Sequence, residues 1–227
     1  SIPGSVVFAI DAKVRQLRAD GVDVVGLGAG QPDFPSPPAA ISAAQRFIES
    51  GNVGYTATPG IPELRAAAAA LVSRVSQRTF EASQIVVTNG AKEALALAIA
   101  TAADPGDELL LPTPAWISYG PMAQIVDVVP VPVTTDVDHD FKLTPSELRS
   151  AITPRSRILL INSPSNPTGA VYTRDELAAL AEVIVEHDLY VLSDEIYSPF
   201  VFEGEFVSPA SIPELADRTI VVNGVSK

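Results

Sequence analysis

The sequence contains no cysteine, and this absence excludes disulfide bonds, thiolate nucleophiles and thiolate metal ligands from these residues. A chain without disulfides fits a reducing compartment, and we expect a cytoplasmic protein. No apolar run reaches the roughly 18 residues that a membrane-spanning helix needs, so no membrane partner is expected. The start, Ser1 to Ser5, lacks the basic segment that opens a secretory signal peptide.

Cationic residues are also few, because 15 Lys and Arg stand against 27 Asp and Glu, for a net charge of −12. A nucleic-acid-binding face needs clustered Lys and Arg, so we expect no nucleic-acid partner. A bound anion would need backbone N–H groups, helix ends and a few placed cations. What the chain does have is apolar residues, which make up 47% of its 227 positions, enough for a sizeable core.

Short apolar runs alternate with amphipathic segments from about residue 83 onward, which predicts an α/β fold. The expected strands are 85–88, 108–111, 125–133, 157–161, 189–192 and 219–222. The expected helices are 5–20, 38–50, one from 62, 93–103, one from 145, 174–187 and 212–218. This alternation predicts a mixed, mostly parallel central sheet with helices on both faces.

Several local signals refine this outline. Thr144 and Thr173 each open a capping box, and Pro130 and Pro132 indicate that the strand at 125–133 lies at a sheet edge. A further strand is expected at 22–27. We assign residues 1–35 to an N-terminal arm and part of a smaller second domain, only partly present, and residues 36–227 to the large domain.

Gly26, Gly28 and Gly30 superficially resemble a dinucleotide-binding fingerprint. The third glycine comes one residue early, and Pro32 and Pro35 obstruct the helix that should follow. The glycines either form a tight loop or allow a ligand to approach the backbone, and the residues alone leave both interpretations open.

Unusual residues follow the expected strands, where the chemistry of α/β proteins is found. They are Gly90, Ala91 and Lys92, Trp116, Asn166, Asp194 with Tyr197, and Lys227. Each alone has an ordinary explanation as a surface lysine, a core aromatic, a turn or a helix cap. Together they offer an anion site at a helix start, a ring to stack on, a carboxylate and an amine. Pyridoxal phosphate needs this set of groups.

Six segments, in order along the chain, resemble the fold-type I aminotransferases and in particular the aspartate aminotransferase family. They are Gly28 to Phe34, Gly54 to Arg65, Asn89 to Leu95, Asn162 to Gly169, Ser193 to Tyr197 and Asn223 to Lys227.

The resemblance implies a role for each matching residue. Lys227 forms the Schiff base with pyridoxal 5'-phosphate and then moves protons, while Asp194 pairs with the pyridinium nitrogen. Asn166 and Tyr197 hydrogen-bond the phenolic oxygen, and Trp116 stacks on the ring. Gly90, Ala91, Lys92 and Ser226 belong to the cofactor site, and Tyr55 reaches the phosphate of a partner subunit, which implies a homodimer with shared sites. Gly30, Asn166, Trp116 and Lys92 contact the substrate.

The family resemblance also implies an activity. An amino acid, with aspartate or glutamate favoured by Lys92, donates its amino group to a 2-oxo acid. The family's Asn166–Pro167 bond is expected to be cis. The family chain continues past the lysine with two arginines, for the phosphate and the substrate α-carboxylate. We expect the sequence to break at Lys227 because this lysine carries the cofactor. A true fragment would instead leave half a sheet uncovered.

Alternatives share part of this pattern. A β-lyase or decarboxylase of the same fold would use the same Lys227 and Asp194. Gly224-Val225-Ser226 resembles the start of a hydrolase nucleophile elbow, but Lys227 then occupies the motif's fourth position. A pyridoxal-binding regulatory module would need a basic DNA-binding segment, which these residues lack.

Overall fold

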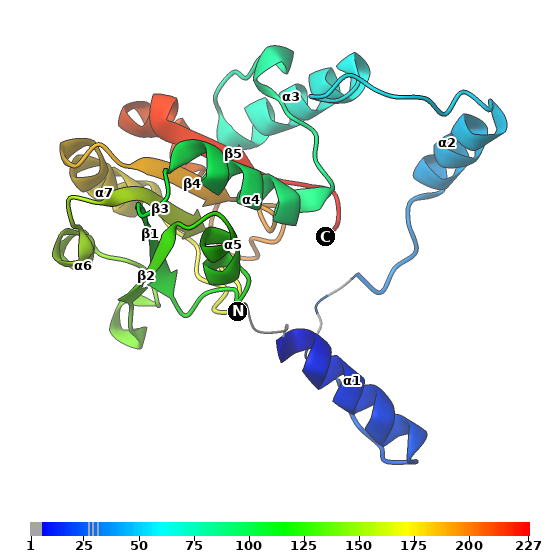
Figure 1. Cartoon of the computed structure of the whole chain (residues 1–227), viewed down its shortest axis with the longest axis horizontal. Helices are drawn as coiled ribbons and strands as arrows, with labels where there is room; N and C mark the ends of the chain where they lie inside the picture. Colours follow the sequence, from blue (N-terminus) through cyan, green and yellow to red (C-terminus); the bar gives the residue numbers. More distant parts are fainter. Residues whose placement is uncertain (1–5, 27, 29, 31) are drawn as a thin grey trace. The chain divides into compact units, whose positions relative to one another are not determined.

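The computed structural model describes residues 6–26, 28, 30 and 32–227. The chain forms two compact units, one of residues up to 56 together with Ser226 and Lys227, and one of residues 57–225. Figure 1 labels the elements of both. None of the described helices is both long and apolar enough to cross a membrane.

The first unit contains α1 (Val6–Ala19) and α2 (Pro38–Glu49). Helix α2 begins with Pro38 in its first turn, where a missing N–H costs nothing. The helical spacing of Ile41, Ala44, Phe47 and Ile48 predicts a face turned inward, but this prediction is wrong because all four are exposed. The strand expected at 22–27 is also wrong over residues 22–26, and residue 27 lies outside the described residues.

The second unit contains a five-stranded parallel sheet in the order β2-β1-β3-β4-β5. Its strands are β1 (Glu108–Thr113), β2 (Val129–Thr134), β3 (Ser156–Asn162), β4 (Tyr190–Asp194) and β5 (Thr219–Val222). Its helices are α3 (Pro62–Ser76), α4 (Gly90–Ala102), α5 (Tyr119–Ile125), α6 (Pro145–Ala151) and α7 (Arg174–Glu186). Short 3-10 turns complete it: η1 (Ala82–Gln84), η2 (Val137–His139), η3 (Pro209–Ser211) and η4 (Pro213–Arg218).

Helices cover both faces of this sheet, as the sequence predicts (Figure 1). Successive strand residues point to opposite faces, so Leu110 and Leu159 pack with α6 and α7, whereas Leu109 and Leu160 pack with α4 and α5. Each fully buried side chain of this size contributes about 1.5–3 kcal/mol. The two apolar layers therefore fix the sheet between the helices.

Both predicted capping boxes are confirmed. Thr144 accepts a hydrogen bond from the Glu147 N–H, and Glu147 accepts one from the Thr144 N–H; Thr173 and Glu176 repeat the arrangement at α7. The edge position of β2 is also confirmed, since β2 is the first strand in the sheet order. An edge strand can include Pro130 and Pro132 because it does not need every N–H donor.

Three expectations about local structure are wrong. Residues 85–88 are not a strand; Val87 donates a hydrogen bond to the Pro59 carbonyl instead. Strand β2 starts at Val129 rather than at 125, because Ile125 ends α5 and Asp127 turns the chain with φ 58°. Apolar residues on nearly every side of 93–103 predict a buried helix, but α4 is not buried all round, since Leu97 is half exposed.

One buried charge ties the amino ends of β1 and β3 together. The Glu108 carboxylate, 2% exposed, accepts hydrogen bonds from the Thr153 and Ser156 hydroxyls at 2.6 and 2.9 Å and from the Arg155 guanidinium at 3.0 and 3.2 Å. Burial alone would raise the pKa of Glu108, but these donors outweigh it and hold that pKa below its usual value.

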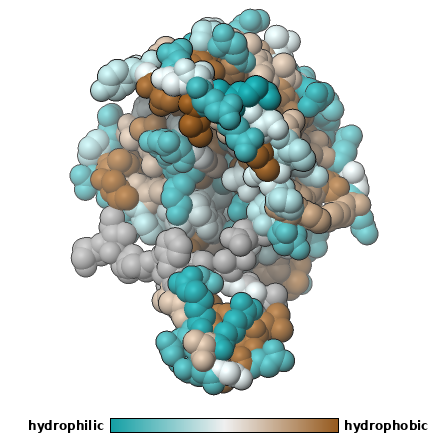
Figure 2. Space-filling model, turned by 90° about the vertical axis from the view of Figure 1, so that its right-hand side faces the viewer, coloured by the Kyte–Doolittle hydropathy of each residue, from teal (hydrophilic) through white to brown (hydrophobic). Residues whose placement is uncertain are grey.

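Hydrophobic side chains also reach the surface. Figure 2 shows brown, hydrophobic residues among teal, hydrophilic ones on the face that it presents. The exposed hydrophobic side chains of the larger unit include Ile61, Leu64, Leu71, Val86 and Leu97. Most of them lie in or beside α3 and α4.

Candidate active site

The carboxyl ends of three neighbouring strands meet at Asp194, the last residue of β4. Asp194 pairs in register with Asn162, the last residue of β3, and with Val222, the last residue of β5. Its side chain is buried, at 3% exposure. An acid at this edge of a parallel sheet lies where α/β proteins bind ligands.

Two donors hold the Asp194 carboxylate. The Tyr119 hydroxyl donates to Oδ2 at 2.7 Å, and the Ile196 N–H donates to Oδ1 at 3.2 Å. Burial raises the pKa of Asp194, while both hydrogen bonds work against that rise. The pKa of Tyr119 is raised in turn, by burial and by the negative charge of Asp194.

An aromatic row leads from Asp194 to the start of α4. The Trp116 ring meets the Tyr119 ring edge to face, with centroids 5.3 Å apart and planes 84° apart. The Lys92 Nζ lies 5.1 Å from the centre of the Trp116 ring, within the range of a cation–π contact. The predicted residues Lys92, Trp116 and Asp194 are thus brought together, with Tyr119 between them.

A polar row leads from Asp194 in the other direction. The Asn162 side chain donates to the Asp194 carbonyl at 3.0 Å and accepts from the Asn166 N–H at 2.7 Å. Burial raises the pKa of Tyr197, Asp194 adds to the rise, and a side-chain hydrogen bond with Asn166 opposes it. Asn166 and Tyr197, predicted to act together, are therefore neighbours.

The expected cis bond between Asn166 and Pro167 is confirmed, and Thr113–Pro114 and Ser163–Pro164 are cis as well.

The first turn of α4 has open space beside its backbone. Gly90 adopts φ +77°, which disfavours any residue with a Cβ, and a Cβ built there would meet open space. Ala91 packs against the core, so the helix start is anchored. Backbone N–H groups and the positive end of the helix dipole favour an anion at this position.

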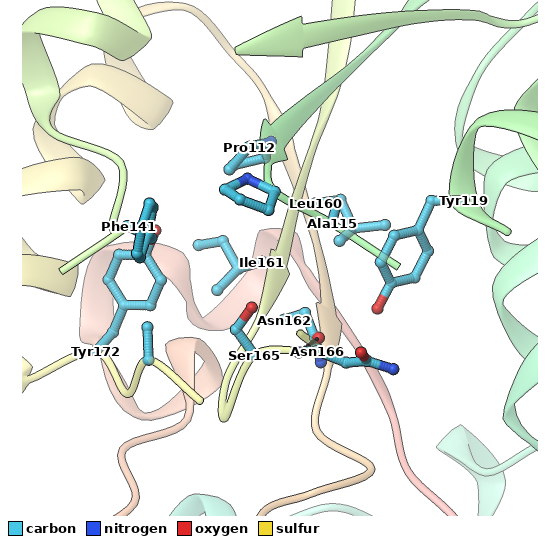
Figure 3. Close-up of a pocket in the computed structure, with 12 residues that line it drawn as sticks. Pro112, Ala115, Tyr119, Phe141, Leu160, Ile161, Asn162, Ser165, Asn166 and Tyr172 are labelled. Carbon is cyan, nitrogen blue, oxygen red and sulfur yellow. Dashed lines mark hydrogen bonds between the residues drawn. The ribbon is translucent and has the colours of Figure 1, made fainter. Parts of the chain in front are cut away.

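A small cavity adjoins this edge of the sheet (Figure 3). Figure 3 draws Tyr119 on one side of it and Phe141 with Tyr172 on the other, with Asn162 and Asn166 nearby. Its volume of about 20 Å³ has room for one water molecule. The cavity is therefore too small to be the place of an aromatic cofactor.

The other predicted residues belong to the smaller unit. Lys227 Nζ donates to the Gly30 carbonyl at 3.1 Å. Tyr55 is fully exposed, and so is most of Ser226. Gln31, inside the first matching segment, lies outside the described residues.

The sequence patterns do not single out two buried side chains at this edge. Tyr119 lies on α5, a helix that the patterns miss; the one signal for it is a second aromatic residue three positions after Trp116. Glu195 follows Asp194 and is 1% exposed. Its Oε1 accepts hydrogen bonds from the Ser193 and Ser208 hydroxyls, while its Oε2 is buried with no hydrogen-bond partner among the residues that the structure describes.

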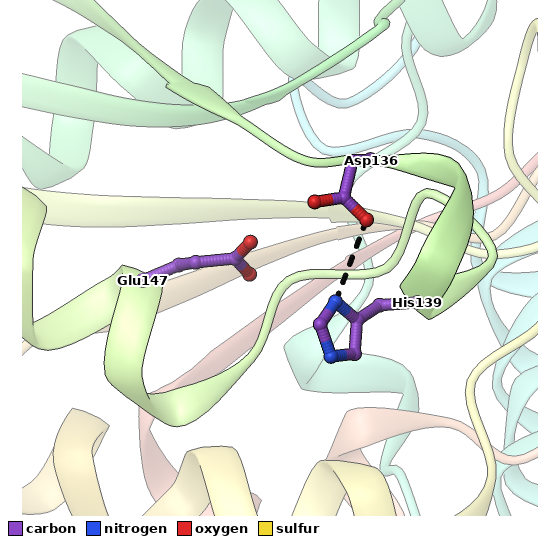
Figure 4. Close-up of side chains that lie close together, drawn as sticks. All are labelled: Asp136, His139 and Glu147. Atoms are coloured by element: carbon purple, nitrogen blue, oxygen red, sulfur yellow. Dashed lines mark ion pairs between the residues drawn. The ribbon is translucent and has the colours of Figure 1, made fainter.

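Asp136, His139 and Glu147 form a separate cluster, with ligand atoms close enough to share a metal ion (Figure 4). Asp136 Oδ1 lies 3.5 Å from His139 Nδ1 and also caps the Asp138 N–H. Glu147 is held by the capping box of α6. Each carboxylate thus already has a donor in the protein, and the local turn and helix start account for the cluster.

Comparison with known proteins gives consistent results. Residues 22–227 match the family model "Aminotransferase class I and II". The chain is 45% identical to an aspartate/prephenate aminotransferase of Cereibacter sphaeroides over 98% of its length and 56% of that protein's. It is 42% identical to an aspartate aminotransferase of Bacillus subtilis, over 98% of this chain and 57% of the relative.

A solved structure gives the same result. All of this chain superposes on 59% of the aspartate aminotransferase of Thermus thermophilus with maleate, with a TM-score of 0.94 and 42% identity. The chain therefore spans a little more than half the length of these relatives.

Proposed function

Because the chain belongs to the class I and II aminotransferase family, we propose that it is part of a pyridoxal-phosphate-dependent aminotransferase, which moves an amino group from an amino acid to a 2-oxo acid. The observation that carries the proposal is the buried Asp194 carboxylate. It lies at the carboxyl end of β4, where Tyr119 and Asn162 contact Asp194 and the Tyr119 ring in turn meets Trp116.

The residues of the larger unit fit the cofactor. Asp194 offers a charged partner for a pyridinium nitrogen in a region from which water is excluded. The open space above Gly90, at the start of α4, suits a phosphate group. Trp116 offers a ring face for stacking, and the hydrogen-bonded pair of Asn166 and Tyr197 offers polar groups for a phenolic oxygen. When bound, pyridoxal phosphate supplies an electron sink for electrons left at a substrate carbon.

Lys227 is the proposed nucleophile and proton carrier. It follows Val222, the register partner of Asp194, by five residues, and a chain of that length spans at most about 18 Å. Its Nζ is the amine that would hold the cofactor covalently, and as a free amine it would carry the proton of the substrate α-carbon.

The proposed amino donor is aspartate or glutamate. Lys92, beside Trp116, would face the distal carboxylate of such a substrate, with Gly30 and Asn166 at its α-carboxylate. At least four relatives carry prephenate as well as aspartate in their names, so prephenate belongs among the acceptors to be tested. We further propose a cytoplasmic homodimer, in which the fully exposed Tyr55 reaches the cofactor phosphate of the partner subunit.

The test uses the full-length protein with aspartate and 2-oxoglutarate. We expect oxaloacetate and glutamate in equal amounts, only when both substrates are present, and no activity in Lys227→Ala. Lys13→Ala, an exposed substitution on α1, serves as control. Release of ammonia or carbon dioxide from aspartate alone would instead indicate a β-lyase or a decarboxylase. A protein that neither binds pyridoxal phosphate nor transfers the amino group would refute the proposal.

A further inference from the structure

Tyr119 contacts two of the proposed cofactor-binding residues at once. It lies in the first turn of α5 and is 1% exposed. Its hydroxyl donates to Asp194 Oδ2 at 2.7 Å, and its ring meets the Trp116 ring edge to face. A single side chain thus links the carboxylate to the stacking surface.

The charge of Asp194 depends on its donors. Burial favours the neutral acid, and a neutral acid could not pair with a pyridinium by charge. The Ile196 N–H, at 3.2 Å, is the longer of the two contacts, and the Tyr119 hydroxyl is the shorter. Two other titratable side chains interact electrostatically with Asp194. Tyr197 has a raised pKa, and Glu195 adds a second acid in the same buried region.

We propose that Tyr119 is a positioning residue of the cofactor site, which keeps Asp194 ionised and oriented and fixes the plane of Trp116 against it. This inference rests on the proposed function. In this role Tyr119 acts through Asp194 and Trp116 and does not itself touch the cofactor.

A merely structural role is the alternative. A buried hydroxyl needs an acceptor, and Asp194 could be serving Tyr119 rather than the reverse. The two roles predict different behaviour when the hydroxyl is removed. A structural role affects only the unfolding transition. A positioning role changes how tightly the cofactor is held and how that affinity depends on pH.

The experiment compares Tyr119→Phe with Tyr172→Phe in the full-length protein. Tyr172 is also buried, and its hydroxyl accepts a hydrogen bond from the Leu143 N–H. The measurements are the dissociation constant of pyridoxal phosphate, by titration of the cofactor-free protein, and its dependence on pH. Tyr119→Phe keeps the ring against Trp116 and removes only the donor.

We expect cofactor affinity to fall about tenfold or more in Tyr119→Phe, the range for a lost hydrogen bond to a charged group. Loss of the donor raises the pKa of Asp194. The acid-side loss of affinity should therefore begin at a higher pH than in the wild type. Tyr172→Phe should lower the unfolding temperature but leave both cofactor measurements unchanged.

A second variant covers the case in which Tyr119→Phe does not fold. Site-specific 3-fluorotyrosine at position 119 keeps the shape but has a more acidic hydroxyl, which donates more strongly. The acid-side loss of cofactor affinity should then begin at a lower pH than in the wild type, opposite to its shift in Tyr119→Phe. Unchanged affinity and an unchanged pH profile in the variants, with a wild type that binds the cofactor, would overturn this inference alone. A wild type that binds no cofactor would overturn the proposed function instead.

Discussion

The Lys92 ammonium lies 5.1 Å from the centre of the Trp116 ring. Lys92 is exposed and Trp116 is half buried, so the cation lies over an aromatic face at the border of the site. This contact orients a positive charge beside the proposed ring-stacking surface without burying it.

We predict that Lys92→Met lowers kcat/KM for aspartate about tenfold to a hundredfold, the range for a lost charge-assisted hydrogen bond. Methionine keeps an unbranched side chain over Trp116 and removes the charge. Activity with alanine as donor, which has no distal carboxylate, should change little. Equal losses with both donors would show that Lys92 does not select acidic substrates, and Lys13→Met on α1 provides the surface control.

Glu195 predicts an unusual pH dependence of stability. Burial and the charge of Asp194 raise its pKa to about 7, although the Ser208 and Ser193 hydroxyls oppose the rise. The folded protein therefore keeps the Glu195 proton to a higher pH than the unfolded chain does. The resulting stability is present below about pH 4.5 and is lost as the pH rises towards 7.

We therefore expect Glu195→Gln, which cannot ionise, to be more stable than the wild type at pH 8. The gain is at most about 3 kcal/mol, given about 1.4 kcal/mol per pKa unit. Near pH 4.5 the two proteins should be equally stable. Urea unfolding at both pH values measures this, with Glu182→Gln on the exposed side of α7 as control. A variant less stable than the wild type at pH 8 would contradict it.

Glu108 predicts the opposite pH dependence. Its donors hold its pKa below the usual value, so its contribution to stability is present above the unfolded-state pKa and is lost as the pH falls. Glu108→Gln should reduce the free energy of unfolding by about 1–3 kcal/mol at pH 7, the cost of disturbing a buried hydrogen-bonded group. The difference should shrink in acid. Glu214→Gln, an exposed change, should have no such effect, and a pH-independent loss in Glu108→Gln would argue against a role for its charge.

The backbone at Gly60 leaves no room for a Cβ atom. Its φ is +105°, and a Cβ there would lie 2.6 Å from the Val87 Cγ2. Gly60→Ala should therefore cost about 1–3 kcal/mol of unfolding free energy from backbone strain, with an added penalty from the clash. Val87→Ala in the same chain removes Cγ2 but leaves Cβ at 2.8 Å, so it should relieve part of the clash and none of the strain, giving a partial recovery in thermal unfolding. Full recovery would show that the φ angle carries no cost.

The sequence predicts most of the sheet and part of the site, for physical reasons that differ. Strand β5 is predicted to the residue, because its β-branched residues, Thr219 to Val222, favour an extended conformation between a polar turn and a glycine. Residues 85–88 have the same composition, but the described residues give them no strand partner: Val87 donates to the Pro59 carbonyl and Ile85 accepts from the Arg65 side chain. A strand needs a hydrogen-bonded neighbouring strand, which composition does not reveal.

The predicted residues that follow strands share an edge because parallel strands end together, so Asn162 and Asp194 meet in register. Tyr119 escapes prediction because Gly120 and Pro121 read as a turn. In the structure this proline lies in the first turn of α5, where a missing N–H is tolerated. The partner of a buried acid can therefore come from a helix that local pattern does not reveal.

Strand β4 is hydrogen-bonded on both sides, to β3 and to β5, so the backbone that bears Asp194 cannot shift without breaking two ladders. Amide protons of Leu192 and Ser193 should accordingly exchange with solvent only through global opening. The backbone at Asp194 is therefore fixed in place by its two neighbouring strands. Any backbone adjustment near Asp194 must occur in the segments around β4.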